Sequence, residues 1–156
     1  LASHADETLN IISDLTTQEK EILSNFKYRK NKAVIHSDES SMPKNRKAWC
    51  SWNSSLNPKN NQQSSVTYWL NQLQNLKIDK NIFLTINPFF NINPDLIYNT
   101  IDFTHPYYDQ KALENQSKLR SIQNINNTLY AGSYFGYGFH EDGIKSSIEM
   151  LKTLND

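Results

Sequence analysis

The sequence predicts an α+β fold in which a mostly antiparallel or mixed sheet is flanked by helices. Its 156 residues suit one domain, and 37% hydrophobic with 21% charged residues is typical of a folded globular chain. Short runs rich in β-branched and aromatic residues fill the middle of the chain, whereas helical spacing marks both ends. Strands and helices kept in separate stretches favour α+β over a complete doubly wound sheet.

Two helices are predicted near the N-terminus, after the end of a strand at residues 1–3. Residues 6–12 form a short helix with apolar side chains on one face. The helix over residues 17–26 is better marked, because Thr16 and Glu19 have the spacing of a capping box. Its apolar stripe consists of Ile22, Leu23 and Phe26.

The middle of the chain is predicted to form one largely antiparallel sheet with helix 17–26 beside it. Residues 37–47 form a polar loop, and residues 54–65 form a hairpin loop or a longer surface excursion. Pro88 and Pro94 bracket an irregular stretch, because proline removes a donor from the ladder. The four predicted strands are residues 33–36, 48–52, 66–70 and 82–86.

The C-terminal part is predicted as helix, strand, glycine-rich loop and helix. Residues 109–123 have helical spacing, and residues 128–131 are typical of a strand. The last helix covers residues 141–154. Its apolar face consists of Ile144, Ile148, Leu151 and Leu154.

Composition excludes several function classes. Sixteen basic and sixteen acidic residues cancel, which argues against nucleic acid or an anionic membrane as a partner. No run reaches the roughly 20 apolar residues of a membrane helix. The chain has a single cysteine, Cys50, which excludes an internal disulfide and favours a reducing, cytoplasmic location. We expect Cys50 to be a buried inert thiol. The four histidines, His4, His36, His105 and His140, lie too far apart in the sequence to indicate a metal site.

All four glycines of the chain fall within residues 131–143, which we call the glycine window. A strand that passes through glycines into a helix presents unpaired N–H groups and the positive end of a helix dipole. Such an end suits a phosphate or the electron-rich edge of a reduced flavin. The alternative is a flexible loop, but flexible linkers seldom carry aromatic residues of this number. The aromatic residues of the window are Tyr134, Phe135, Tyr137 and Phe139.

The glycine window carries a family resemblance. It reads Ala-Gly-Ser-Tyr-Phe-Gly-Tyr-Gly-Phe-His-Glu-Asp-Gly and resembles the C-terminal flavin-binding motif of the flavin-containing amine oxidase superfamily. More narrowly, it is similar to a bacterial group of predicted NAD/FAD-binding oxidoreductases. Glu141, Gly143 and Ser146 match the acidic, small and serine positions of the family's last helix. Residues 1–6, 47–53, 66–71 and 103–106 are similar to further segments of that group.

The resemblance implies that the chain is the C-terminal part of an FAD-dependent oxidoreductase that transfers a hydride from its substrate to the flavin. Residues 1–8 would end a connecting strand of the FAD domain, residues 9–124 would form a substrate-domain-like α+β region, and residues 125–156 would contact FAD. No general base is named, and His140 is the only catalytic candidate. The resemblance assigns cofactor contacts to Gly132, Ser133, Gly136, Tyr137, Gly138, Phe139, His140, Glu141, Asp142 and Gly143.

The sequence departs from the family pattern in two respects. Ser133 stands where many amine oxidases have a glutamate, and no Gly-x-Gly-x-x-Gly follows a strand. Because that fingerprint seats the FAD pyrophosphate, we expect the chain alone to hold no stoichiometric flavin and to be inactive. Its expected partners are a preceding nucleotide-binding half, a small-molecule substrate and a second copy of the chain. Leu1 in place of an initiator methionine also favours the preceding half.

A second interpretation remains open, namely a non-enzymatic α+β module that binds a ligand or a protein through an aromatic-rich face. Trp52, Tyr68 and Trp69 would line a substrate pocket under the first interpretation. Aromatic residues in strands are also common core residues, and both roles are carried forward.

Overall fold

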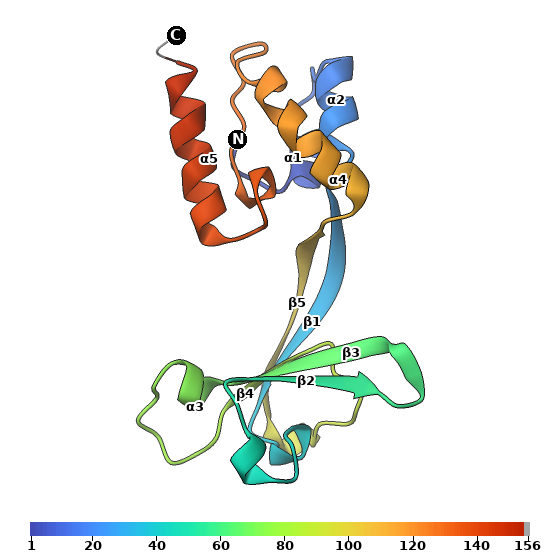
Figure 1. The fold of residues 1–156 in the computed structure, drawn as a ribbon, viewed down its shortest axis with the longest axis vertical. Helices are drawn as coiled ribbons and strands as arrows, with labels where there is room; N and C mark the ends of the chain where they lie inside the picture. Colours follow the sequence, from blue (N-terminus) through green and yellow to red (C-terminus); the bar gives the residue numbers. More distant parts are fainter. Residues whose placement is uncertain (155–156) are drawn as a thin grey trace. The chain divides into compact units, whose positions relative to one another are not determined.

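The computed structural model describes residues 1–154. They divide into two compact units: unit 1 contains Leu1–Arg29 and the chain from His105 onward, and unit 2 contains Lys30–Thr104. Unit 1 is mainly helical, and unit 2 contains most of a five-stranded sheet (Figure 1). The predicted α+β class is therefore confirmed. The last two residues of the predicted C-terminal region lie outside the described part of the chain.

Unit 1 buries a small core between its helices. Helix α2 contacts both α1 and the 3-10 helix η4, and α5 packs against the 3-10 helix η5. The core includes Ala5, Leu23, Leu119, Tyr130 and Tyr134, all at most 2% exposed. The helical elements are α1 (Ala5–Ile11), α2 (Thr17–Leu23), α4 (Gln110–Gln116), η4 (Ser117–Ile122), η5 (Ser133–Phe135) and α5 (His140–Lys152).

The helices of unit 1 begin where the sequence predicts them. Thr16 caps α2 by accepting the N–H of Glu19, whose carboxylate accepts the N–H of Thr16 in return. The predicted helix at residues 109–123 is α4 followed directly by η4, with Asp109 accepting the N–H of Ala112. The predicted strand at residues 128–131 is absent. Its backbone instead makes two isolated bonds with Leu1.

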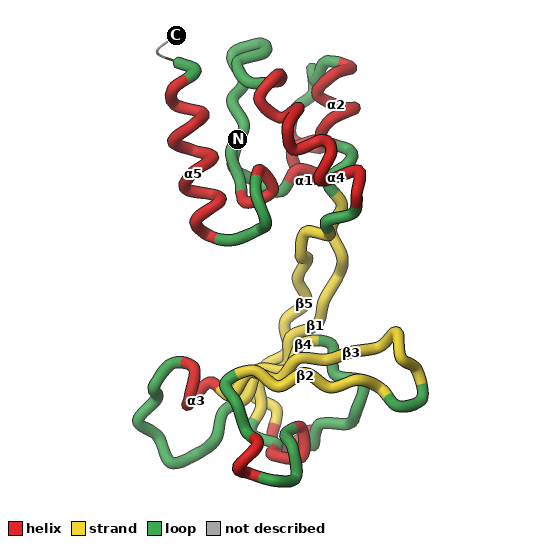
Figure 2. Tube along the Cα trace, in the orientation of Figure 1, coloured by secondary structure: helices red, strands yellow, loops and turns green. Residues whose placement is uncertain are grey.

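The sheet has the strand order β2-β3-β4-β1-β5. Figure 2 shows the long loops that connect its strands. The predicted strand at 33–36 lies within β1, 66–70 largely within β3, and 82–86 largely within β4. The strands are β1 (Lys27–His36), β2 (Trp52–Asn57), β3 (Asn60–Trp69), β4 (Phe83–Ile86) and β5 (Ile97–Tyr107), and α3 (Leu70–Leu73) directly follows β3.

Several sequence predictions for the sheet were wrong in detail. Of the predicted strand 48–52 only Trp52 belongs to a strand, β2, because a 3-10 turn ends at Ala48 and the Trp49 indole donates to the carbonyl of Pro43. Residues 54–65 are not a loop: most of them form the β2–β3 hairpin. Strand β5 was not predicted. Helix α2, expected beside the sheet, belongs to unit 1.

The bounds of the two compact units differ from those of the three regions expected from the resemblance. Residues 9–29 and 105–124 pack with the C-terminal segment in unit 1, so the expected region 9–124 does not coincide with one unit. The reason is that apolar residues of α2 and η4 share one core with Tyr130 and Tyr134.

One face of the sheet is covered and buries polar side chains. His36, Thr67 and Thr85 are each at most 1% exposed, and the Thr85 hydroxyl lies 2.8 Å from His36 Nε2 and 2.9 Å from Thr67 Oγ1. Trp49 packs on this face, against Trp69 and Phe83. Burial lowers the pKa of His36 and so favours the neutral imidazole over the charged one.

Candidate functional site

The glycine window leads from the buried Tyr130 into helix α5. At the N-terminal end of α5 it borders an open hollow of about 410 Å³, which we call the α5 hollow. Its position follows from the sequence, since the chain turns from an extended segment into a helix at that point. The α5 hollow is lined by Ala2, Gly132, Ser133, Phe139, His140, Gly143, Ile144 and Ser147.

A serine one turn into α5 holds the two sides of the hollow together. The Ser146 hydroxyl accepts a hydrogen bond from the N–H of Gly132 at 2.9 Å and donates to the carbonyl of Gly143 at 2.7 Å. Ser146 is 6% exposed, so both bonds are shielded from water. This side chain therefore fixes the start of the glycine loop against the helix.

Asp142 shapes the tip of the loop. Its carboxylate accepts the N–H groups of Tyr137 at 2.9 Å and Phe139 at 3.0 Å. A side chain at position 136 would collide with that carboxylate, because a Cβ built on Gly136 lies 2.4 Å from it. Glycine at 136 is thus required by close approach.

Gly138 provides the left-handed turn. Its φ is +92°, and a Cβ there would lie 3.0 Å from the hydroxyl oxygen of Tyr108. Burial and the nearby charge of Asp142 raise the pKa of Tyr108. The prediction that Gly136, Gly138 or both have positive φ is confirmed by Gly138, whereas Gly136 has a φ of −134°.

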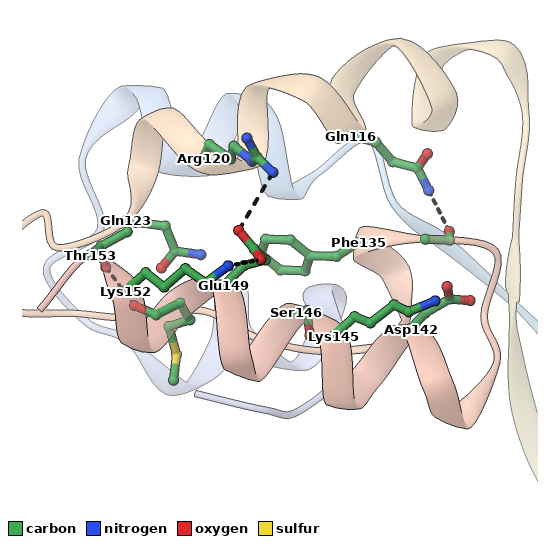
Figure 3. Close-up of a pocket in the computed structure, with 12 residues that line it drawn as sticks. Gln116, Arg120, Gln123, Phe135, Asp142, Lys145, Ser146, Glu149, Lys152 and Thr153 are labelled. Carbon is green, nitrogen blue, oxygen red and sulfur yellow. Dashed lines mark hydrogen bonds and ion pairs between the residues drawn. The ribbon is translucent and has the colours of Figure 1, made fainter.

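Two glutamines, the last residue of α4 and the residue directly after η4, hold the other side of the loop. Gln116 donates to the carbonyls of Tyr134 and Gly136, the latter at 2.5 Å. Gln123 both donates to the carbonyl and accepts from the N–H of Tyr130. Figure 3 shows both side chains facing α5 across a second hollow, of about 430 Å³. There Arg120 and Lys152 both pair with Glu149, whose pKa the Lys152 hydrogen bond lowers.

The first turn of α5 leaves donors unused. The N–H groups of Asp142 and Gly143 bond to the carbonyl of Phe139. Those of His140 and Glu141 have no hydrogen-bond acceptor among residues 1–154. His140 also lines the α5 hollow. Free N–H groups at the start of this helix were predicted, and they lie where the helix dipole is positive.

The structure divides the ten predicted cofactor contacts among several places. The α5 hollow brings together Gly132, Ser133, Phe139, His140 and Gly143. Gly136 and Asp142 instead line the second hollow. Tyr137 is 74% exposed, and Glu141 is exposed and pairs with Lys145 at 3.6 Å. Gly138 packs on Tyr108.

Some residues of the site were missed by sequence reasoning. Ala2, Ile144 and Ser147 line the α5 hollow, and Gln116 and Gln123 support the loop. The one available signal was the spacing of seven residues between the two glutamines, which places them on a similar side of a helix. Nothing in the sequence links them to a loop farther along the chain.

The predicted aromatic pocket is only partly assembled. Trp52 and Tyr68 are directly opposite each other in the β2–β3 ladder, with ring centroids 5.3 Å apart in an edge-to-face arrangement. Trp69 lies on the covered face, where its indole donates to Asn81. Trp69 therefore cannot line a pocket with the other two.

The remaining expectations concern Cys50, a metal site and a membrane helix. Cys50 is exposed, which corrects the expected buried thiol. No group of three or more His, Cys, Asp or Glu residues that could hold a metal occurs in the described part of the chain. Nor does any helix within residues 1–154 combine the length and apolar character needed to cross a membrane.

No protein-family model matches the chain, and no curated protein matches it at a significant level. The resemblance to flavin amine oxidases therefore depends on the sequence segments quoted above.

Proposed function

We propose that the chain is the C-terminal part of an FAD-dependent, amine-oxidase-like oxidoreductase, and that the α5 hollow contacts the flavin. The observation that supports this most is the pair of unused N–H groups of His140 and Glu141, beside a hollow that His140, Gly132 and Gly143 line. Unpaired donors at a helix N-terminus favour an anion or an electron-rich ring edge.

The residues present fit part of the cofactor. Backbone donors at the start of α5, with Phe139 as an apolar wall, suit one edge of a planar ring system. No strand–glycine turn–helix unit that could seat a pyrophosphate occurs among residues 1–154. We expect the pyrophosphate and adenosine of FAD to be bound by a separate nucleotide-binding segment.

The apolar stripe of α5 supports such a second segment. Ile144, Ile148 and Leu151 are between 53% and 59% exposed along one face of the helix. An exposed apolar face of this length is typical of an interface. We assign it to the nucleotide-binding half.

In the working enzyme the flavin would accept the hydride, and this chain would position it. The free N–H groups of His140 and Glu141 would stabilise negative charge at the ring edge that they face. Ser146 and Asp142 would hold the loop in shape. His140 lines the hollow and is the only candidate for a proton-carrying group there. A cytoplasmic location and a bacterial origin belong to the same proposal.

The test is bound flavin in a protein that joins this chain to the coding sequence upstream of Leu1. We expect that sequence to contain a Gly-x-Gly-x-x-Gly in the same reading frame and the joined protein to retain FAD after desalting, measured by visible absorption. Gly143→Val should lose the flavin, because the added side chain fills the hollow. The fold itself should tolerate a Cβ at this position, since its nearest neighbour would lie 3.9 Å away.

Lys145→Val is the matched control, because Lys145 lies on the same helix but lines the second hollow. It should retain the flavin. The chain from Leu1 alone should retain none. One equivalent of flavin on the isolated chain, or equal retention by the two variants, would contradict the assignment of the α5 hollow.

The second candidate is a non-enzymatic module that binds a ligand through an aromatic-rich face. It is favoured by the exposure of Trp52, 65%, next to Tyr68. A start codon near Leu1 with no upstream nucleotide-binding fingerprint would select it over the oxidoreductase.

A further inference from the structure

The first residues of the chain lie beside the segment that precedes the glycine window. The backbone nitrogen of Leu1 donates to the carbonyl of Leu129 at 2.5 Å, and the N–H of Ala131 donates to the carbonyl of Leu1 at 2.9 Å. A residue that bonds to the two neighbours of its partner in this way has the hydrogen-bond pattern of a parallel ladder. Leu1 and Tyr130 are therefore directly paired, and the two segments that contain them run in the same direction.

The far edge of the second segment is closed by the chain itself. The N–H of Thr128 donates to the carbonyl of Ile125 at 2.8 Å, and its carbonyl accepts the N–H of Asn124 at 2.9 Å. Tyr130 both donates to and accepts from the carboxamide of Gln123. The glutamine side chain thus takes the place of a neighbouring strand, and no further strand can pair with Tyr130 on that side.

Ala2 presents the open edge of the pair. Alternate residues of a strand direct their N–H and C=O groups to opposite sides. Since Leu1 bonds toward Leu129 and Ala131, the backbone groups of Ala2 point the other way. They have no hydrogen-bond partner among residues 1–154, and Ala2 is exposed. Unpaired backbone donors and acceptors at the edge of a sheet are the groups to which an added strand bonds.

This open edge meets the apolar stripe of α5. Ala2 and Ile144 line the same α5 hollow. Ile144 is 59% exposed, and Ile148, one turn farther along the helix, is 53% exposed. A strand paired with Ala2 would therefore lie beside isoleucine side chains. Strands of parallel sheets are typically apolar on both faces, which suits such a neighbour.

Helices flank the paired segments on two sides. The Tyr130 side chain belongs to the core that α1, α2 and η4 share, and its hydroxyl donates to Glu19. On the other side, the N–H of Gly132 donates to Ser146 of α5. Figure 1 shows the segment before the glycine window passing between α5 and α4. This is the layering of a parallel sheet, yet two paired segments are fewer than the roughly three strands that a stable sheet needs.

We propose that residues 1–3 and 129–131 are the last two strands of a larger parallel sheet, and that the next strand, an extended apolar segment, pairs with the backbone of Ala2. The identification of this strand as part of the nucleotide-binding half rests on the proposed function. Its place beside Ala2, rather than beside Tyr130, follows from the hydrogen bonds within unit 1.

The added strand is compatible with a flavin at the α5 hollow. Both paired segments run toward this hollow, which Ala2 and Gly132 line. In open parallel sheets, ligands bind beyond the carboxyl ends of the strands. The new strand would extend the sheet sideways from Ala2, whereas the free N–H groups of His140 and Glu141 lie at the start of α5. The strand and the ring edge therefore use different groups of the protein.

The test is amide exchange of Ala2, measured by NMR in the ¹⁵N-alanine-labelled protein that joins this chain to the coding sequence upstream of Leu1. The Ala2 signal is assigned by its loss in Ala2→Ser. Ala131 is the internal reference, because its N–H is already bonded to Leu1. We expect Ala2 to exchange at least about 100-fold more slowly than an unstructured peptide, at a rate comparable to that of Ala131.

Ala2→Pro removes the backbone donor and should lower the Tm of the joined protein by at least about 3 °C, because pairing with the next strand is weakened. Ala2→Ser is the matched control. It keeps the donor and should change the Tm by less than about 1 °C. Equal Tm values for the two variants would overturn the proposal. So would unprotected exchange of Ala2 in the unaltered protein, which decides the matter even if Ala2→Pro fails to fold.

Protection of Ala2 that depends on protein concentration, with dimers in sedimentation, would assign the open edge to a second copy and also overturn the proposal. Flavin retention by a joined protein in which Ala2 is unprotected would contradict this proposal alone. A protected Ala2 without bound flavin would contradict the proposed function alone. The added strand and the flavin contact can therefore fail separately.

Discussion

Asparagine replaces glycine at the tight turns of this chain. Within the described residues, each non-glycine residue with positive φ is an asparagine, and the four glycines are kept in one window. Asparagine tolerates the left-handed region better than other side chains because its amide can bond locally. These asparagines are Asn75, Asn87, Asn124, Asn126 and Asn127. At Gly136 and Gly138, by contrast, a Cβ would also meet a neighbouring side chain.

The two kinds of glycine in the window should respond oppositely to alanine. Gly138→Ala places a Cβ at φ +92° and 3.0 Å from Tyr108, so we expect a loss of roughly 1–3 kcal/mol in the free energy of unfolding. Gly143→Ala lies inside α5 with room for a Cβ and should gain about 0.5–1 kcal/mol from helix propensity. Urea unfolding followed by circular dichroism measures both. Changes of the same sign would contradict the loop geometry.

Hydrogen bonds between elements add to the hydrophobic core in organising unit 1. The Tyr130 hydroxyl donates to the Glu19 carboxylate at 2.5 Å, and this joins α2 to the segment before the glycine window. Gln123, directly after η4, holds the same segment at Tyr130, and Gln116 of α4 holds the glycine window itself at Gly136. The loop that borders the α5 hollow is therefore positioned by three polar side chains from two helical regions.

The Glu19 link predicts an acid-sensitive fold. Burial alone would raise the pKa of Glu19, but hydrogen bonds from the Thr16 hydroxyl, the Tyr130 hydroxyl and the Thr16 N–H together lower it below 4.5. The stabilising effect of the carboxylate is therefore present above pH 4.5 and is lost as the pH falls through the lowered folded-state pKa. Glu19→Gln should cost about 1–3 kcal/mol near neutral pH.

Glu19→Gln should also reduce the loss in the free energy of unfolding between about pH 7 and about pH 3, measured by urea unfolding. Glu21→Gln is the control, since Glu21 lies exposed on the same helix. An acid limb unchanged by Glu19→Gln would show that other carboxylates determine the acid response.

At the scale of the whole molecule, the chain contains two separate sets of buried contacts. The core of unit 1 includes Leu119 and Tyr130, whereas unit 2 buries Phe83, His36 and Thr85 on the covered face of the sheet. Strands β1 and β5 each begin in one unit and end in the other. Cooperativity within each set should exceed cooperativity between them.

Core deletions should therefore act on one unit at a time. Phe83→Ala, at a side chain with no exposure, should cost about 3–5 kcal/mol and speed amide exchange in β3 and β4. Leu119→Ala, equally buried, should cost about 2–5 kcal/mol and speed exchange in α2 and η4. Hydrogen exchange read by mass spectrometry resolves the two. If both variants speed exchange equally throughout the chain, the two units unfold as one.

The sequence alone determined the local features of this protein. The Thr16–Glu19 capping box, the helical spacing of the last segment, the alternation in residues 82–86 and the left-handed turn at Gly138 all depend on neighbours within a few residues. The α+β class follows from such local signals, and so does the place of the glycine window before a helix. Strand β5 escaped prediction because Pro106 and scattered polar residues obscure its alternation.

Only the tertiary structure decided which segments meet. Helix α2 shares a core with Tyr130, Gln116 reaches the carbonyl of Gly136, and Trp69 turns away from Trp52 and Tyr68. A shift of one residue in strand register would exchange the two faces of the sheet, so no local pattern could show which face is the covered one. Contacts between distant segments depend on how whole elements pack, and this information is spread over the chain.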